Sequence, residues 1–140
     1  MSDNWVGFRS VPKGDRNRKL EKRKFEYTLE SAGPKVVNAF VKQEQFEKWF
    51  GEVSRFDSRQ GGRITFEREG TQFQGAFSRI QIPKLISFVT EFHGEIEMRL
   101  KEGRQTKLTL KFQKAILPTE KDQWLAEVDS LQAKLLEELV

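Results

Sequence analysis

Apolar and polar residues alternate through most of residues 25–112, which is the pattern of β-strands that bury one face. The first run extends from Phe25 to Leu29. Gly94 and Gly103 separate the last three runs, so these three form an up-and-down meander. The pattern predicts six further strands, in the ranges 53–58, 64–66, 72–82, 86–92, 96–100 and 106–112.

The last stretch, Thr119 to Val140, has a different period. Its apolar residues recur at spacings of four, three, four and four, which places them on one face of a helix. At 1.5 Å per residue, about 22 residues give a rod of roughly 33 Å, long enough to cross a whole sheet. The stripe consists of Trp124, Val128, Leu131, Leu135 and Leu139.

Two short helices are predicted between the first and second strands. Pro34 occupies a favoured first helical position and begins a helix that extends to Val41. Gly51 is placed to end a second helix over 43–50. Within 72–82 the apolar residues change from odd to even positions, which predicts a bulge. The predicted fold class is therefore α+β, with a curved antiparallel sheet of six or seven strands around a long C-terminal helix.

The size and composition of the chain favour one domain. A chain of 140 residues buries roughly 70% of its unfolded surface around one core, and we expect that domain to span residues 21–140. The absence of cysteine excludes structural disulfides and thiol catalysis. We find no apolar run of about 18 residues and no signal-peptide stretch, so we expect a cytoplasmic protein without a membrane span.

The net charge of +4 is concentrated at the N-terminus. Residues 1–24 hold eight Lys or Arg against three acidic residues, whereas the remainder carries a net charge of −1. We therefore predict a flexible basic arm over residues 1–20 and no specific nucleic-acid partner. Any contact with a polyanion is expected to be electrostatic and made by this arm.

The order of one strand, two short helices, six strands and one long helix resembles the helix-grip fold of the START and birch-pollen-allergen superfamily, also called SRPBCC. Local motifs are similar to those of the AHSA-like proteins, the branch named for activators of the heat-shock chaperone ATPase. The matching stretches are 34–40, 46–50, 61–66, Gly75 with 82–88, 106–110 and 124–131. This resemblance implies a curved sheet wrapped around the last helix, often with a cavity that admits apolar small molecules. It does not imply one reaction, because the superfamily includes lipid carriers, polyketide cyclases and hormone receptors.

Aromatic residues are the main indication of a site, because the chain has twelve phenylalanines and three tryptophans. Large rings between sheet and helix are suited to a flat or acyl ligand. The alternative is a core that the same rings fill completely. The candidate cavity-lining residues are Phe46, Trp49, Phe66, Phe73, Phe77, Phe88, Phe112, Trp124 and Val128.

No motif in the sequence indicates catalysis, a cofactor or a metal site. His93 is the single histidine, and Gly94 beside it indicates the tip of a hairpin, where we expect a surface side chain. Charged residues on the last helix, including Glu127, are likewise expected in solvent.

Three functional hypotheses follow. The first is a non-enzymatic domain that binds a hydrophobic small molecule between the sheet and the last helix. The second is a protein-interaction module linked to chaperones or the stress response, acting through its surface and the basic arm. The third is a cyclase-like enzyme. The oligomeric state stays open.

Overall fold

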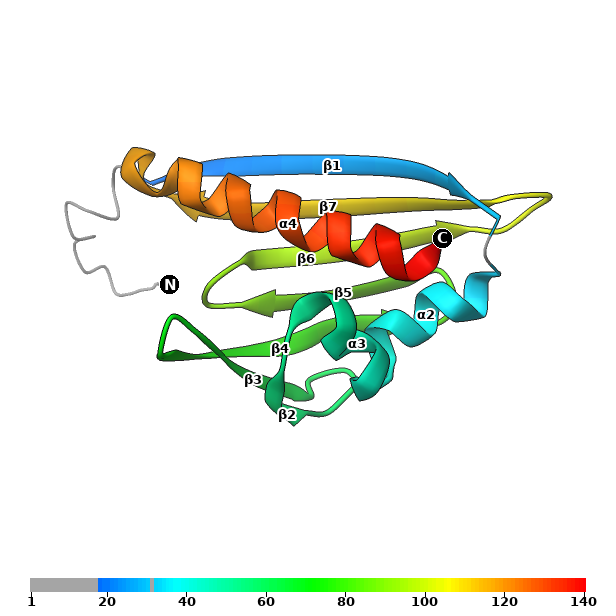
Figure 1. Ribbon diagram of the computed structural model, residues 1–140, viewed down its shortest axis with the longest axis horizontal. Coiled ribbons are helices and arrows are strands. Elements are labelled where there is room, and N and C mark those ends of the chain that lie inside the picture. Colours follow the sequence, from blue (N-terminus) through cyan, green and yellow to red (C-terminus); the bar gives the residue numbers. More distant parts are fainter. Residues whose placement is uncertain (1–17, 31) are drawn as a thin grey trace, which may run out of the picture.

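The computed structural model describes residues 18–30 and 32–140, which form a seven-stranded antiparallel sheet and the helices that pack on it (Figure 1). The order of strands across the sheet is β1-β7-β6-β5-β4-β3-β2. This arrangement confirms the α+β helix-grip architecture expected from the sequence. The strands are β1 (Lys19–Leu29), β2 (Val53–Phe56), β3 (Arg63–Arg68), β4 (Thr71–Gln81), β5 (Leu85–Thr90), β6 (Gly94–Lys101) and β7 (Thr106–Ile116), and the helices are α2 (Gly33–Val41), α3 (Gln43–Phe50) and α4 (Lys121–Leu139), the last preceded by a 3-10 turn at Pro118–Glu120.

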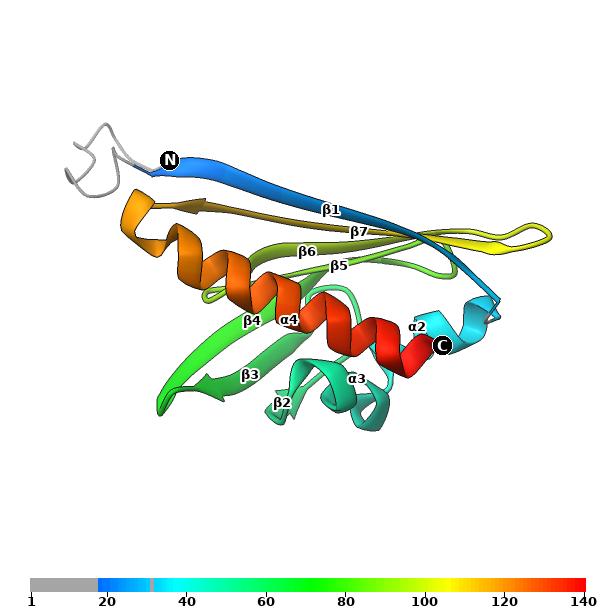
Figure 2. The ribbon, with the colours of Figure 1, turned by 45° about the horizontal axis from the view of Figure 1, so that its top comes forward.

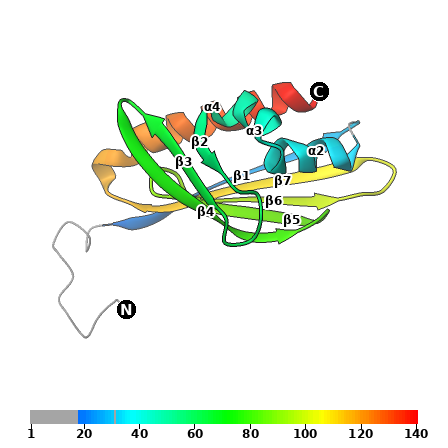
Figure 3. The same cartoon turned by 90° about the horizontal axis from the view of Figure 1, so that it is seen from below.

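The sheet is curved, and the helices lie on one side of it (Figures 2 and 3). The register between β4 and β5 shifts between Phe77 and Arg79, which confirms the bulge expected from the change of apolar parity. Gly75 lies next to β5, where a Cβ atom would stand 2.5 Å from the carbonyl oxygen of Val89. The close approach of β4 to the backbone of β5 therefore requires a residue without a side chain at position 75.

The side chains of the inner face of the sheet alternate with those of the outer face along each strand. In β7, for example, Leu108, Leu110 and Phe112 are buried, and the residues between them face outward. The five stripe residues of α4 are 5% exposed or less. Burying one large apolar side chain stabilises the fold by about 1.5–3 kcal/mol, so the contact of α4 with the sheet is a main source of stability.

The two short helices lie on the inner side of the sheet, α3 next to β2 and α2 next to the C-terminal end of α4 (Figures 1 and 2). The indole Nε1–H of Trp49 in α3 donates a hydrogen bond of 2.7 Å to the carbonyl oxygen of Ala39 in α2. Gly51 ends α3 with a φ of 108°, a conformation that favours glycine. The pair is thus fixed as one unit that packs against α4.

The first strand is longer than its alternation indicates. It begins at Lys19, before the predicted start at Phe25, because it pairs with β7 along its whole length, from Lys19 with Ile116 to Leu29 with Thr106. As an edge strand it carries charged side chains that hide the period. Residues 1–17 of the predicted basic arm lie outside the described residues.

Candidate functional site

The nine residues predicted to line a cavity all lie between the sheet and the helices. They come from α3, β3, β4, β5, β7 and α4. Phe73 is half-buried, and the other eight are 5% exposed or less. The sequence therefore located the interior of the fold correctly, and the next question is which of these side chains border open space.

Phe88 is the centre of a packed cluster of rings at the α3 side of the interior. Its ring centroid lies 5.5 Å from that of Phe46, 5.8 Å from that of Phe50 and 5.8 Å from that of Phe77. Trp49 follows at 6.5 Å. These separations are typical of favourable aromatic pairs. At this end of the interior, aromatic rings occupy the space in which a ligand was expected.

A hollow of about 240 Å³ opens at the opposite end, where α4 begins. The start of α4, the β5–β6 turn and the start of β4 lie together there (Figure 1). We call this space the inner hollow. Its lining residues are Phe73, Glu91, Phe92, Lys114, Ile116, Glu120, Gln123 and Trp124.

Half of the residues that line the inner hollow are apolar, and three of its four polar residues are charged. Lys114 Nζ donates to the carbonyl oxygen of Phe92 at 2.9 Å, and Glu91 accepts from the backbone N–H of Gln74 at 2.8 Å. Burial lowers the pKa of Lys114 from its ordinary value. Of the nine predicted residues, only Phe73 and Trp124 are among the lining residues of this hollow.

His93 is buried, which corrects the expectation of a surface residue. Its exposed fraction is 0%. The backbone N–H of His93 donates to Thr90 Oγ1 at 2.8 Å, which folds the β5–β6 turn inward, and Gly94 continues the chain with a φ of 78°. The ring then stacks on Phe66 with centroids 5.6 Å apart. Alternation cannot reveal this placement, because the turn interrupts the two-residue period of the strands.

Glu127 is also turned toward the interior, although we expected it in solvent. Its Oε2 lies 2.8 Å from His93 Nε2 and accepts a hydrogen bond of 3.3 Å from Arg68 Nε. The guanidinium of Arg68 lies over the ring of Phe66, 5.1 Å from its centroid. Trp124 Nε1 donates to the carbonyl oxygen of His93 at 3.0 Å. Trp124 and Glu127 therefore hold the start of α4 against the β5–β6 turn.

Burial sets the protonation states in this cluster. Desolvation lowers the pKa of His93 from its ordinary value, and the hydrogen bond from His93 lowers that of Glu127, as does the nearby Arg68. The imidazole is consequently neutral at neutral pH and donates its Nε2–H to an ionised Glu127. The Nδ1 atom then accepts from the hydroxyl of Thr90, 2.9 Å away.

A hydroxyl, an imidazole and a carboxylate are thus connected in the order used by nucleophilic catalysts. Thr90 is 3% exposed and His93 is fully buried. A carbonyl substrate therefore has no approach to the hydroxyl, which already accepts the backbone N–H of His93. The geometry indicates that this cluster positions α4 and the turn. Among the described residues, no group of three or more His, Cys, Asp or Glu side chains is arranged to hold a metal ion.

Sequence reasoning missed six of the residues that line the inner hollow. Lys114 and Ile116 continue the inward parity of β7 beyond Phe112, so the two-residue period was a usable signal for both. A signal also existed for Glu127, which belongs to the His93 cluster and does not line the hollow. It lies next to Val128 and one turn after Trp124, at the border of the buried stripe. Phe92 continues the even positions of Ile86 and Phe88 in the strand predicted over 86–92, although β5 ends at Thr90 and Phe92 lies in the turn.

The comparisons with known proteins agree with this fold. The family model for "Activator of Hsp90 ATPase homolog 1-like protein" matches residues 34–137. The chain belongs to this family. The match covers the interval from the start of α2 to the end of α4. No curated protein matches the sequence.

Several solved structures share the fold of this family member. The Mll3558 protein from Rhizobium loti is 21% identical with a TM-score of 0.71, and the alignment covers 87% of this chain and 99% of that one. The Aha1 dimer from Colwellia psychrerythraea is 15% identical, with a TM-score of 0.66 and coverages of 85% and 93%. DynU16, described as a putative protein in the dynemicin biosynthetic locus, is 16% identical, with a TM-score of 0.65 and coverages of 84% and 46%. At these identities the likeness establishes the fold.

Proposed function

We propose that the protein binds a hydrophobic small molecule in the inner hollow without transforming it. The observation that carries this proposal is the position of the hollow. It opens between α4 and the sheet, and it is bordered by Phe73 and Trp124, two of the residues selected from sequence for this role. Phe92 and Ile116 add apolar surface to the wall. The polar residues of the lining are Glu91, Lys114, Glu120 and Gln123.

The size of the hollow limits the ligand. Its volume of about 240 Å³ is below the range of about 300–1,000 Å³ that is usual for ligand pockets. The packed rings around Phe88 leave no comparable space at the α3 end of the interior. The ligand is therefore a short apolar molecule, or the end of a longer one whose remainder lies outside α4.

The two other hypotheses have weaker support. A chaperone-associated interaction through the basic arm depends on residues 1–17, outside the described part of the chain, although one relative is an Aha1 dimer. A cyclase-like reaction has a parallel in the biosynthetic-locus relative. It would need an accessible acid or base, and the Thr90, His93 and Glu127 cluster is shielded from substrate by burial.

A titration with Nile red, an uncharged apolar dye, tests the proposal. Gln123 is exposed on α4 at the edge of the hollow, so Gln123→Trp places a large side chain over its mouth with little effect on the core. We expect the affinity for Nile red to fall about tenfold or more, a change of about 1.4 kcal/mol or more. Ala126→Trp, on an exposed position of the same helix, is the matched control and should bind as the natural protein does.

Two results would overturn the proposal. One is the absence of saturable Nile red binding to the natural protein. The other is equal binding by the natural protein and Gln123→Trp, since a dye in the inner hollow must meet the new indole. If Nile red binds in the inner hollow as expected, its displacement by fractions of an extract of apolar metabolites identifies the class of the natural ligand.

A further inference from the structure

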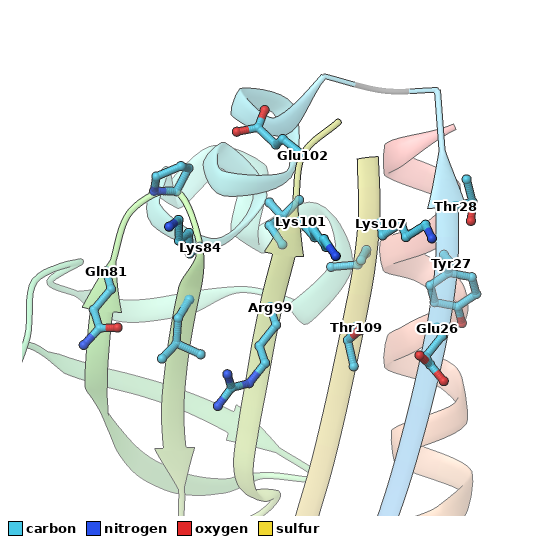
Figure 4. Close-up of a pocket in the computed structure, with 14 residues that line it drawn as sticks. Glu26, Tyr27, Thr28, Gln81, Lys84, Arg99, Lys101, Glu102, Lys107 and Thr109 are labelled. Atoms are coloured by element: carbon cyan, nitrogen blue, oxygen red, sulfur yellow. The ribbon is translucent and has the colours of Figure 1, made fainter. Parts of the chain in front are cut away.

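A second hollow, of about 970 Å³, lies on the outer face of the sheet, opposite α4 (Figure 4). It is bordered by the β4–β5 turn, the end of β6 and the start of β7 and is far from the inner hollow along the strands. We call it the outer hollow. It has no part in the function proposed above.

Lysines dominate the charge of the outer hollow. Lys84, Lys101 and Lys107 line it and are exposed. Lys101 and Lys107 are direct cross-strand partners in β6 and β7, and like charges in such positions destabilise a sheet. Within the described residues none of the three forms an ion pair, whereas Arg99, also in the lining, is paired with Glu97 at 2.8 Å.

The two carboxylates that border the outer hollow do not neutralise these lysines. Glu26 lies 3.9 Å from Lys24, an ion pair on its own strand. The carboxylate of Glu102 packs against Gly33 at the start of α2, and Figure 4 shows it directed away from Lys101 and Lys107. The repulsion between the two opposed lysines is therefore uncompensated in the protein alone.

The lining of the outer hollow also contains uncharged polar groups beside the lysines. Thr28 and Thr109 carry hydroxyls and Gln81 carries an amide, all of which donate hydrogen bonds to anionic oxygens. The Nζ groups of lysines bind phosphate as point charges. We propose that the outer hollow binds a small molecule that carries two or more phosphate groups, held by Lys84, Lys101 and Lys107.

The surroundings favour a small ligand over an extended polyanion. Further along the outer face of β6 the chain carries Glu95 and Glu97. Glu97 forms ion pairs with Arg79 and Arg99 and so offsets the charge of these arginines, and the basic surface does not continue along this strand. A nucleic-acid strand or a membrane needs a continuous basic track or plane. A compact polyphosphate needs only the concave patch that the three lysines border.

The test is a calorimetric titration of the full chain with inorganic tripolyphosphate at low ionic strength. We expect saturable binding with one site and a loss of about tenfold or more in affinity for the double variant Lys101→Gln/Lys107→Gln, since two charge-assisted contacts are removed. The matched control is Lys48→Gln/Lys134→Gln, which removes the same charge from exposed helical positions. Lys101→Arg/Lys107→Arg retains the charge and should bind within a few-fold of the natural protein.

The comparison of variants decides the result. Binding that weakens equally in both Gln variants would reflect net charge only, and it would overturn the proposal, as would no saturable binding to the natural protein. A parallel arm uses vesicles of phosphatidylcholine with 20% of an anionic phosphoinositide. If vesicles bind through Lys101 and Lys107 and tripolyphosphate does not, the partner is a membrane surface and the proposal of a small ligand is wrong. Thermal unfolding of each variant verifies that it is folded.

Discussion

The two hollows lie at opposite ends of the sheet and on opposite faces. Both include residues of β7, whose side chains alternate between the two faces of the sheet. In β7, Lys107 and Thr109 face outward and border the outer hollow, whereas Lys114 and Ile116 face inward and border the inner hollow. The outer hollow needs only the surface of neighbouring strands. The inner hollow exists only while α4 is held against the β5–β6 turn. We therefore expect the two sites to respond independently to mutation, salt and pH.

The largest expected effect comes from Trp124→Ala. It removes a buried wall of the inner hollow and the hydrogen bond to the carbonyl of His93. Truncation of a buried Trp costs about 3–5 kcal/mol in the free energy of unfolding, measurable by urea denaturation. Nile red binding should be lost, and tripolyphosphate affinity should be unchanged while the protein is folded.

Because a domain is stable by only about 5–15 kcal/mol, Trp124→Phe is the milder companion variant. It keeps a ring in the wall but leaves the carbonyl of His93 without its donor, at a cost of about 1–3 kcal/mol. If either variant lost the tripolyphosphate site while still folded, the two hollows would not be independent.

Salt should weaken ligand binding to the outer hollow and leave ligand binding to the inner hollow unchanged. Raising sodium chloride from about 0.05 M to about 0.5 M screens the exposed lysines, and we expect the affinity for tripolyphosphate to fall about tenfold or more. Nile red affinity should stay within about twofold, because apolar burial does not depend on counter-ions. Titrations of one protein preparation at both salt concentrations measure the two responses. A parallel loss of both affinities would contradict the assignment of an apolar and an ionic site.

A smaller effect is expected from acidification. The folded pKa values of His93 and Glu127 both lie below their ordinary values, so the unfolded state binds more protons as pH falls. Stability contributed by His93 is present above about pH 6.5 and decreases below it, and that of Glu127 decreases below about pH 4.5. Urea denaturation between pH 8 and pH 5 should show this loss.

The variant His93→Gln provides the control for this pH response. Glutamine retains hydrogen-bonding groups but does not titrate, so the decrease just below pH 6.5 should become shallower. An unchanged pH dependence would show that His93 is not the titrating group.

The fold could be predicted from the sequence because the period of the apolar residues indicates which face of a strand or helix is buried. The stripe from Trp124 to Leu139 and the alternation in β7 placed α4 and the sheet correctly, and the parity change in β4 located the bulge. The part of β1 before Phe25, which begins at Lys19, was not predicted, because the charged residues of this edge strand show no two-residue period. The apolar period thus predicts which residues are buried in those strands and helices that have one face against the core.

The residues that line the two hollows were harder to predict from the sequence, because periodicity does not describe how side chains pack. Periodicity identifies Phe88 and Trp124 equally as inward residues, but only packing in three dimensions decides that rings surround Phe88 while space borders Trp124. His93 lies in a turn whose hydrogen bond to Thr90 sets its direction. The opposed lysines of the outer hollow require the register of β6 and β7, which alternation alone does not supply.

The most direct test of the central claim is a titration of isotopically labelled protein with Nile red, followed by the backbone amide resonances. We predict saturable shifts concentrated at Phe73, Phe92, Ile116 and Trp124, with Lys101 and Lys107 unaffected. Shifts that centre on the outer face of the sheet, or no shifts in the residues around the inner hollow at saturating dye, would contradict the account.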